Sequence, residues 1–367
     1  MKPHLVAALT LLVALSGCDD STPRPDGGTP PGTDSGTPPG QDSGTPGTDS
    51  GTPEEDAGSV TPTSPLVDPS CLDGQFSETL PDPDADISDL VAGYSAADPV
   101  AFIDGSLRRR YPSGAEMVAG GRGTTDCATV FLRDTSSAQE IIEQLGTVVH
   151  ECGHFYDNTL SRTARQSYYI NDSPLTLVCQ MGDTTSRGGL TFERSRILND
   201  SWSSGRPGCP ETGPRPDNCD FYARVYLDGN PDDDEFEGGD QGFNMLFEEL
   251  VQYVNSLATS FAYTNELNSG GRSSQKDGLL TFLWYTMRYL HMARNDYPAA
   301  YEHILNGDGG CWRRAILQVW GRAFLYLEAT EGMTHLGIND TLLMGLVETP
   351  ELLQEIQRLR DAEGCGA

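Results

Sequence analysis

The stretch that decides the fold is residues 137–155, SAQEIIEQLGTVVHECGHF. Ser137 and Glu140 form the S-x-x-E pattern of a capping box, which predicts that a helix begins here. Apolar residues recur after it at helical spacing and predict one buried face. They are Ile141, Leu145, Val148, Val149 and Phe155.

Residues 150–154 of this predicted helix, His-Glu-Cys-Gly-His, match the pattern H-E-x-x-H. At 100° per residue His150 and His154 lie about 40° apart, one turn from each other, on the side away from the apolar stripe. Two neutral imidazoles so placed can bind one Zn²⁺, and Glu151 can take a proton from a metal-bound water. The alternative is a pair of exposed histidines without metal. The chain has only six histidines, two of them in this capped helix, which favours the zinc site.

A catalytic zinc site needs a third protein ligand, and the best candidate segment is residues 247–253, FEELVQY. On a helical wheel centred on Phe247, the apolar residues that follow form a buried stripe. Glu248 falls at about 100°, on the border of this stripe, and Glu249 falls at about 200°, facing water. We therefore expect Glu248 to be the ligand. The alternative is that both glutamates lie on the surface and that zinc is bound elsewhere.

Residues 150–157, HECGHFYD, resemble the motif H-E-x-G-H-x-x-D of the lethal-factor-like branch of the gluzincin metallopeptidases, and residues 246–250, LFEEL, resemble their second motif. The resemblance implies a two-lobed zincin-like fold, α+β and predominantly helical, with a small β-sheet. It also implies that His150, His154 and Glu248 are zinc ligands and that Glu151 is the general base. The chain departs from the family in the long stretch of residues 155–247 between His154 and Glu248, and in having no tyrosine shortly before Glu248.

The residue that stabilises the transition state is left open among four candidates, each of which is also typical of a core or surface position. These candidates are Tyr253, Tyr285, Tyr289 and His291.

The first 17 residues have the pattern of a bacterial signal peptide, with Lys2 before the short apolar run Leu5–Leu15. Residues 15–18, Leu-Ser-Gly-Cys, resemble a lipobox, and this resemblance implies that Cys18 becomes the lipidated N-terminus. We therefore expect the protein to be held by acyl chains in the bacterial cell envelope, facing the periplasm or the cell surface.

Residues 18–70 contain a degenerate repeat of Gly, Thr, Pro, Asp and Ser that offers almost nothing to bury, so we expect a disordered linker. Residues 71–367 then form the predicted zincin-like domain, near the upper size limit for one hydrophobic core. Within it, residues 160–240 contain little helical periodicity and many Gly, Pro, Asp and Cys residues. We expect a long irregular insertion there, with one short hairpin.

Charge and cysteine content narrow the function further. The chain carries 54 acidic and 24 basic residues, which argues against binding nucleic acid, or anionic lipid through a basic patch. A peptide or protein is the substrate expected of a metallopeptidase. Eight of the nine cysteines remain after Cys18, and an even number in an exported domain suggests disulfides. Only Cys209–Cys219 can be paired from local sequence, and for Cys152 a disulfide or a buried thiol is favoured over a metal ligand. The acidic run at 228–237 lacks the EF-hand pattern, which favours a solvated loop.

The remaining predicted elements are a helix at 98–111, a strand at 127–133 along the substrate cleft, and a set of C-terminal helices with a 3.6-residue apolar period. Those helices are expected at 244–265, 275–306, 311–330 and 349–362. We expect Trp284, Trp312 and Trp320 in the core.

Together these patterns predict a lipid-anchored zinc metallopeptidase, in which Glu151 deprotonates a zinc-activated water that attacks the peptide bond. Two alternatives stay open: a non-catalytic binding module on a zincin fold, and a zinc hydrolase of a non-peptide amide such as one in the cell wall.

Overall fold

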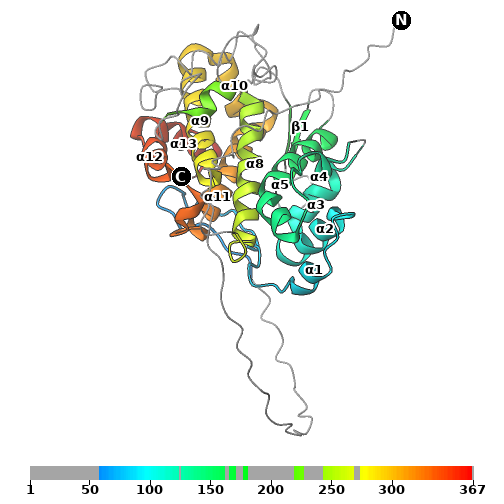
Figure 1. Ribbon diagram of the computed structural model, residues 1–367. Coiled ribbons are helices and arrows are strands. Elements are labelled where there is room, and N and C mark those ends of the chain that lie inside the picture. The colour runs from blue at the N-terminus through cyan, green and yellow to red at the C-terminus, as the bar shows by residue number, and fades with distance from the viewer. Residues whose placement is uncertain are drawn as a thin grey trace, which may run out of the picture.

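The computed structural model describes residues 58–123, 125–161, 165–170, 177–180, 219–226, 243–267 and 273–365. These residues are mostly helical and include one two-stranded sheet, so the fold is α+β and predominantly helical, as predicted (Figure 1). The α-helices are α1 Ser88–Ala92, α2 Pro99–Arg110, α3 Pro112–Gly121, α4 Cys127–Val130, α5 Ala138–Leu160, α7 Phe221–Tyr226, α8 Phe243–Ala262, α9 Gln275–Asp296, α10 Pro298–Asn306, α11 Cys311–Ala329, α12 Asp340–Val347 and α13 Pro350–Glu363. The strands are β1 Arg165–Tyr168 and β2 Leu177–Gln180.

Helix α5 carries the H-E-x-x-H motif and begins where the capping box predicts. Ser137 is the N-cap, and its hydroxyl accepts a hydrogen bond from the backbone N–H of Glu140 at 3.2 Å. The predicted apolar stripe is buried, apart from the half-buried Phe155. Because α5 packs against α3 on one side and α8 on the other, His150 and Glu151 on the opposite face are buried as well.

Helix α8 runs through the middle of the molecule. It lies between α5 on one side and α9 and α11 on the other (Figure 1), and 16 of its 20 residues are buried. A helix surrounded in this way has no face that is free for water. This position places the side chains of α8 against those of α5.

The other helices largely follow the apolar periodicity. Helices α2, α8, α11 and α13 match the predictions at 98–111, 244–265, 311–330 and 349–362. The predicted helix 275–306 is two helices, α9 and α10, because Pro298 lacks the N–H that would continue the first one. Trp284, Trp312 and Trp320 are at most 1% exposed, which confirms that they belong to the core.

The prediction of a strand at 127–133 is wrong. Cys127–Val130 form the short helix α4, whose first turn is closed by hydrogen bonds from the N–H groups of Thr129 and Val130 to the carbonyl of Asp126. Thr, Val and Phe favour a strand only where a partner strand is present to pair with it. Among the described residues near α5, the only paired strands are β1 and β2, which pair with each other. These two strands form an antiparallel hairpin within the predicted insertion, with Arg165 opposite Gln180 and β1 beside α5.

The folded body begins earlier than the predicted linker boundary at residue 70. Val60 forms a β-bridge with Glu78, and the carbonyl of Leu66 accepts hydrogen bonds from Trp320 Nε1 at 2.9 Å and from Arg360 at 2.7 Å. Residues 58–70 therefore lie against the C-terminal helices. The predicted signal peptide, Cys18 and the earlier part of the linker lie outside the described residues.

Three disulfides join segments that are distant in sequence. Cys71 pairs with Cys365, Cys127 with Cys152 and Cys179 with Cys311. Of the two states left open for Cys152, a disulfide or a buried thiol, the structure has the disulfide. Cys219 is also disulfide-bonded, whereas Cys209, its predicted partner, lies outside the described residues, as does the acidic loop at 228–240.

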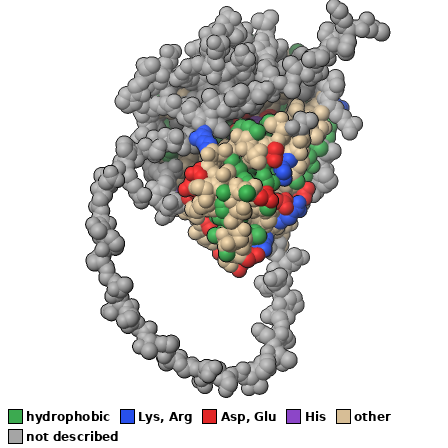
Figure 2. Space-filling model, turned by 45° about the vertical axis from the view of Figure 1, so that its right-hand side comes forward, with side chains coloured by type: hydrophobic (Ala, Val, Ile, Leu, Met, Phe, Trp, Pro, Cys, Tyr) green, Lys and Arg blue, Asp and Glu red, His purple; other side chains and the backbone are tan. Residues whose placement is uncertain are grey.

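Charged side chains of both signs are interspersed on the face formed by the N-terminal helices (Figure 2). Several of them pair with each other there, as in Arg108–Asp104 at 3.0 Å and Arg122–Asp126 at 2.9 Å. Among the described residues, no helix has the length and apolar character needed to cross a bilayer.

Candidate metal centre

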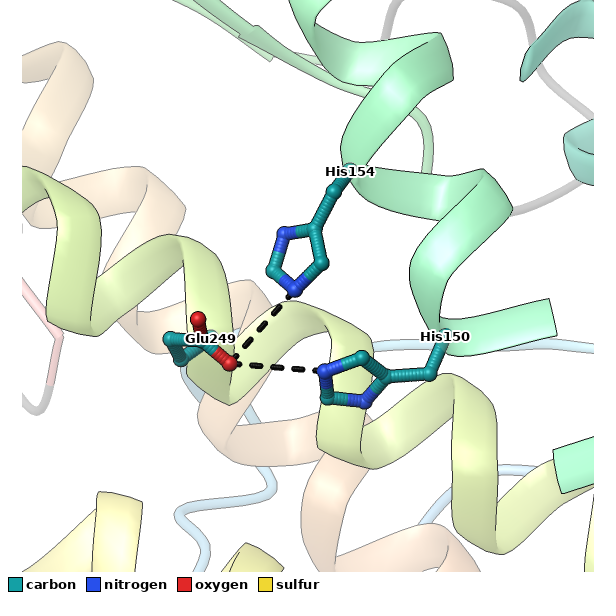
Figure 3. Close-up of side chains that lie close together, drawn as sticks. All are labelled: His150, His154 and Glu249. Atoms are coloured by element: carbon teal, nitrogen blue, oxygen red, sulfur yellow. Dashed lines mark ion pairs between the residues drawn. The ribbon is translucent and has the colours of Figure 1, made fainter. Parts of the chain in front are cut away.

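Helices α5 and α8 bring three potential metal ligands together. Oε2 of Glu249 lies 3.4 Å from Nε2 of His150 and 3.5 Å from Nε2 of His154 (Figure 3). All three ligand atoms lie within 4.8 Å of one another. Two atoms that bind one zinc at tetrahedral angles, each about 2.0–2.1 Å from the metal, lie about 3.3 Å apart. The two distances to Glu249 therefore fit a tetrahedral centre.

The other nitrogen of each imidazole is held by a side chain of α8. Nδ1 of His150 lies 3.1 Å from the hydroxyl of Ser256, and Nδ1 of His154 makes a short hydrogen bond with Oε2 of Glu248. An ionised carboxylate can only accept, so Nδ1 of His154 donates, and Nε2 is the nitrogen that can give up its proton to bind a metal. Partners of this kind fix the tautomer and the ring orientation of a metal-binding histidine.

The structure reverses the expected positions of the two adjacent glutamates. Glu248 was predicted as the ligand and Glu249 was predicted to face water, but Glu249 is only 3% exposed and points between the histidines. Glu248 is the more exposed of the two and contacts His154 from the other side of its ring. The prediction assumed one buried stripe on α8, whereas α8 is covered on several sides.

Glu151 lies next to the two histidines and is 3% exposed. Its Oε2 atom has no hydrogen-bond partner among the described residues. Burial raises the pKa of its carboxyl group, and the positive charges of His150 and His154 partly oppose that rise. An unpaired buried carboxylate oxygen is costly unless something else binds there.

Opposite charges at the centre shift the pKa values of His154 and Glu249 in opposite directions. Burial alone would lower the pKa of His154, but the charges of Glu248 and Glu249 raise it well above its ordinary value. Burial would raise the pKa of Glu249, and the facing histidines lower it instead, to about 2. The carboxylate of Glu249 is therefore ionised, and a metal ion binding here would take the place of a proton on the imidazoles.

Asp157 is the last residue of the stretch HECGHFYD and is 1% exposed. Its Oδ1 accepts a hydrogen bond from the backbone N–H of Tyr169 at 2.7 Å, and its Oδ2 accepts one from Nε2 of Gln252 at 2.8 Å. Burial and the charge of Glu248 raise its pKa well above the ordinary range. Asp157 thus ties the end of α5 to the segment after β1 and to α8.

Of the four candidates for transition-state stabilisation, only Tyr253 lies at the centre. Its ring packs edge-on against His150, 4.8 Å between centroids. Tyr285 donates its hydroxyl to Asp220 at 2.6 Å, Tyr289 packs beside Phe243, and His291 pairs with Glu355 of α13. These contacts place Tyr285 and Tyr289 in other parts of the core, and they place the partly exposed His291 against α13.

Sequence reasoning missed Tyr226 of α7, whose hydroxyl lies 3.5 Å from Oε2 of Glu249. Burial and the charge of Glu249 raise its pKa well above the ordinary value, so it keeps its proton at neutral pH. No spacing rule connects Tyr226 to α8 across the intervening segment. Ser256 was also missed, although it stands seven residues after Glu249 and hence on the same face of α8.

The donor set suits zinc. Two imidazole nitrogens and one carboxylate oxygen form a ligand set that zinc accepts in catalytic sites, where a fourth position stays open. Cys152 takes no part, because its sulfur is bound to Cys127. The described residues thus provide a site that could hold a metal ion, with an acid–base side chain beside it.

Comparisons with known protein families, with curated protein sequences and with solved structures find no match to this chain.

Proposed function

We propose that this protein is a zinc metallopeptidase of the gluzincin type, with a zincin-like fold, anchored by lipid in the bacterial cell envelope. The observation that carries the proposal is the group His150, His154 and Glu249, together with the buried Oε2 atom of Glu151, which has no hydrogen-bond partner among the described residues. A structural zinc site or a binding module needs no buried carboxylate that lacks a partner. Hydrolysis does need one, because a base must take a proton at the reacting centre.

The residues divide into three roles. His150, His154 and Glu249 would hold the metal, while Ser256 and Glu248 keep the imidazole rings oriented. Bound zinc would polarise the scissile carbonyl and activate the attacking water. Glu151 would take the proton of that water on its free Oε2 and pass it to the leaving amine nitrogen.

Tyr226 is the best-placed residue to stabilise charge on the carbonyl oxygen. Its hydroxyl already reaches Glu249 from α7, and it is held between the rings of Tyr222 and Phe282, 6.2 Å and 4.9 Å away. A neutral hydroxyl fixed beside the metal ligands is the kind of donor that stabilises an oxyanion. Tyr253 is better suited to supporting the ring of His150.

The decisive experiment measures the zinc content of the purified protein and its action on a broad peptide library. We expect about one zinc per chain and cleavage that stops when a chelator is added. Protein that neither contains zinc nor takes it up would overturn the metal site. Zinc binding without peptide cleavage would instead favour the binding module, or a cell-wall amide hydrolase if purified peptidoglycan is cleaved.

A further inference from the structure

Gln252 lies at the centre of a buried hydrogen-bond network beside the candidate ligands. Its side chain is fully buried, and Nε2 donates to two carboxylates, Oδ2 of Asp157 at 2.8 Å and Oε1 of Glu248 at 3.3 Å. Its Oε1 accepts a hydrogen bond from Nδ2 of Asn255 at 2.8 Å. Both polar atoms of the amide are therefore used, and the side chain has one favoured orientation.

The backbone of α5 leaves room for this amide. A Cβ atom on Gly153 would lie 1.9 Å from Oε1 of Gln252, far closer than any real contact. Gly153 stands between Glu151 and His154 in the motif, so Gln252 reaches the backbone of the metal-binding helix itself. Any larger residue at 153 displaces the amide.

Gln252 connects to the candidate ligands through Glu248. One oxygen of Glu248 accepts from Gln252, and the other accepts from Nδ1 of His154. The carboxyl groups of Asp157 and Glu248 lie on the same side of this network, and the amide donates to both of them. Without that donor Glu248 loses a contact that fixes its carboxylate toward His154.

From these contacts we propose that Gln252 is a positioning residue of the metal centre, which orients His154 through Glu248. The inference rests on the proposed metal site but not on peptide hydrolysis. Loss of a residue that orients a metal-binding histidine usually weakens metal affinity 10–100-fold. Gln252 contacts Glu248 and not the imidazole of His154 itself, so we expect its loss to lower zinc affinity about tenfold, at the lower end of that range.

The test uses Gln252→Met in the purified protein, which keeps the volume of the side chain and removes both hydrogen-bonding groups. Zinc affinity is measured by competition with a chromophoric chelator, and the absorption spectrum of the Co²⁺-loaded protein reports ligand geometry. Leu257→Ala is the matched control, since Leu257 is a fully buried residue of the same helix without a polar group. It should lower the thermal stability of the metal-free protein and leave zinc affinity and the Co²⁺ spectrum unchanged.

A double-variant comparison tests the route through Glu248. In the Glu248→Ala background, Gln252→Met should cause no further loss of zinc affinity, because the connection is already broken. An equal loss in both backgrounds would show that Gln252 does not act through Glu248. Should Gln252→Met fail to fold, Gly153→Ala provides a second variant that displaces the amide and should cause a similar loss.

The outcomes separate this inference from the proposed function. If the wild type binds no zinc, the metal site itself is wrong. If the wild type binds zinc and both Gln252→Met and Gly153→Ala bind it equally well, the positioning role of Gln252 is overturned while the metal site stands.

Discussion

At the scale of single residues, Glu248 and Glu249 are neighbours in sequence but meet His154 at opposite nitrogens. Glu249 faces Nε2 of both histidines, and Glu248 accepts from Nδ1 of His154. Adjacent residues on a helix point about 100° apart, so the two carboxylates can lie on either side of one imidazole ring. The contribution of each to metal binding should therefore differ in size.

We expect Glu249→Ala to abolish stoichiometric zinc binding, since it removes one of three ligands. Glu248→Ala should keep the ligands and weaken zinc affinity 10–100-fold, because it removes only the partner of His154. Metal content after dialysis and affinity by chelator competition measure both effects. If Glu249→Ala has normal zinc content and Glu248→Ala has none, then Glu248 is the zinc ligand, as the helical wheel predicts.

Glu151→Gln should keep one zinc per chain and lower the rate of peptide hydrolysis by a factor of about 10²–10⁴. The amide has the shape of the carboxylate but cannot accept the proton of the attacking water. Zinc content and turnover of the best library peptide are measured on the same preparation. A variant that still cleaves at the wild-type rate would remove Glu151 from the mechanism.

At the scale of helices and strands, the sequence is informative where one face of an element is buried and less so where the element is enclosed. The capping box of α5 predicts its start correctly, and its apolar period predicts the buried stripe. On α8 the apolar period predicts that a helix forms, but it does not predict which face of the helix points toward α5, because the helix is buried on several sides.

The useful signal on α8 was its polar stripe. Seven polar residues fall within an arc of about 140° on the wheel and face the network around α5. They are Glu248, Glu249, Gln252, Asn255, Ser256, Thr259 and Ser260. Buried polar residues need partners, so a polar stripe on a helix with few exposed positions indicates a second polar surface facing it.

The prediction of a strand at 127–133 is wrong for a related reason. A high local β propensity does not supply the neighbouring strand that a β-strand needs.

The disulfide Cys127–Cys152 links α4 to the helix of the motif, and it should support stability without contributing to metal binding. Replacing both cysteines with alanine removes a cross-link between residues 25 positions apart, which should lower the free energy of unfolding by about 3 kcal/mol. Denaturant titration and zinc content are measured side by side. Loss of zinc under conditions where the protein is still folded would show that the disulfide also positions α5.

At the scale of the whole molecule, the first and last described segments are held together. The disulfide Cys71–Cys365 spans 294 positions, and Arg360 of α13 pairs with Asp73 at 2.6 Å. Residues 58–87 thus run from the C-terminal helices toward α1 (Figure 1). Few sequence patterns reveal such long-range contacts, which is why the start of the folded body was placed too late.

Another of these long-range contacts is the buried ion pair of Glu78 and Arg322. Arg322 is 1% exposed and donates to Glu78 at 2.6 Å and 3.1 Å, and Glu78 also accepts from the hydroxyl of Tyr326 at 2.9 Å. The charge of Glu78 keeps the pKa of Arg322 well above its ordinary value despite burial, so the guanidinium stays charged. Removing Glu78 would leave this charge buried and without its counter-ion.

We therefore expect Glu78→Ala to destabilise the protein by about 3–5 kcal/mol, as the loss of one partner of a buried ion pair does. Asp104→Ala is the control, because the Arg108–Asp104 pair is about half exposed and its loss should cost less than about 1 kcal/mol. Both are measured by urea titration with the disulfides intact. Equal midpoints for the two variants would mean that water reaches Arg322, and that residues 58–87 are not held against α11 in solution as they are in this structure.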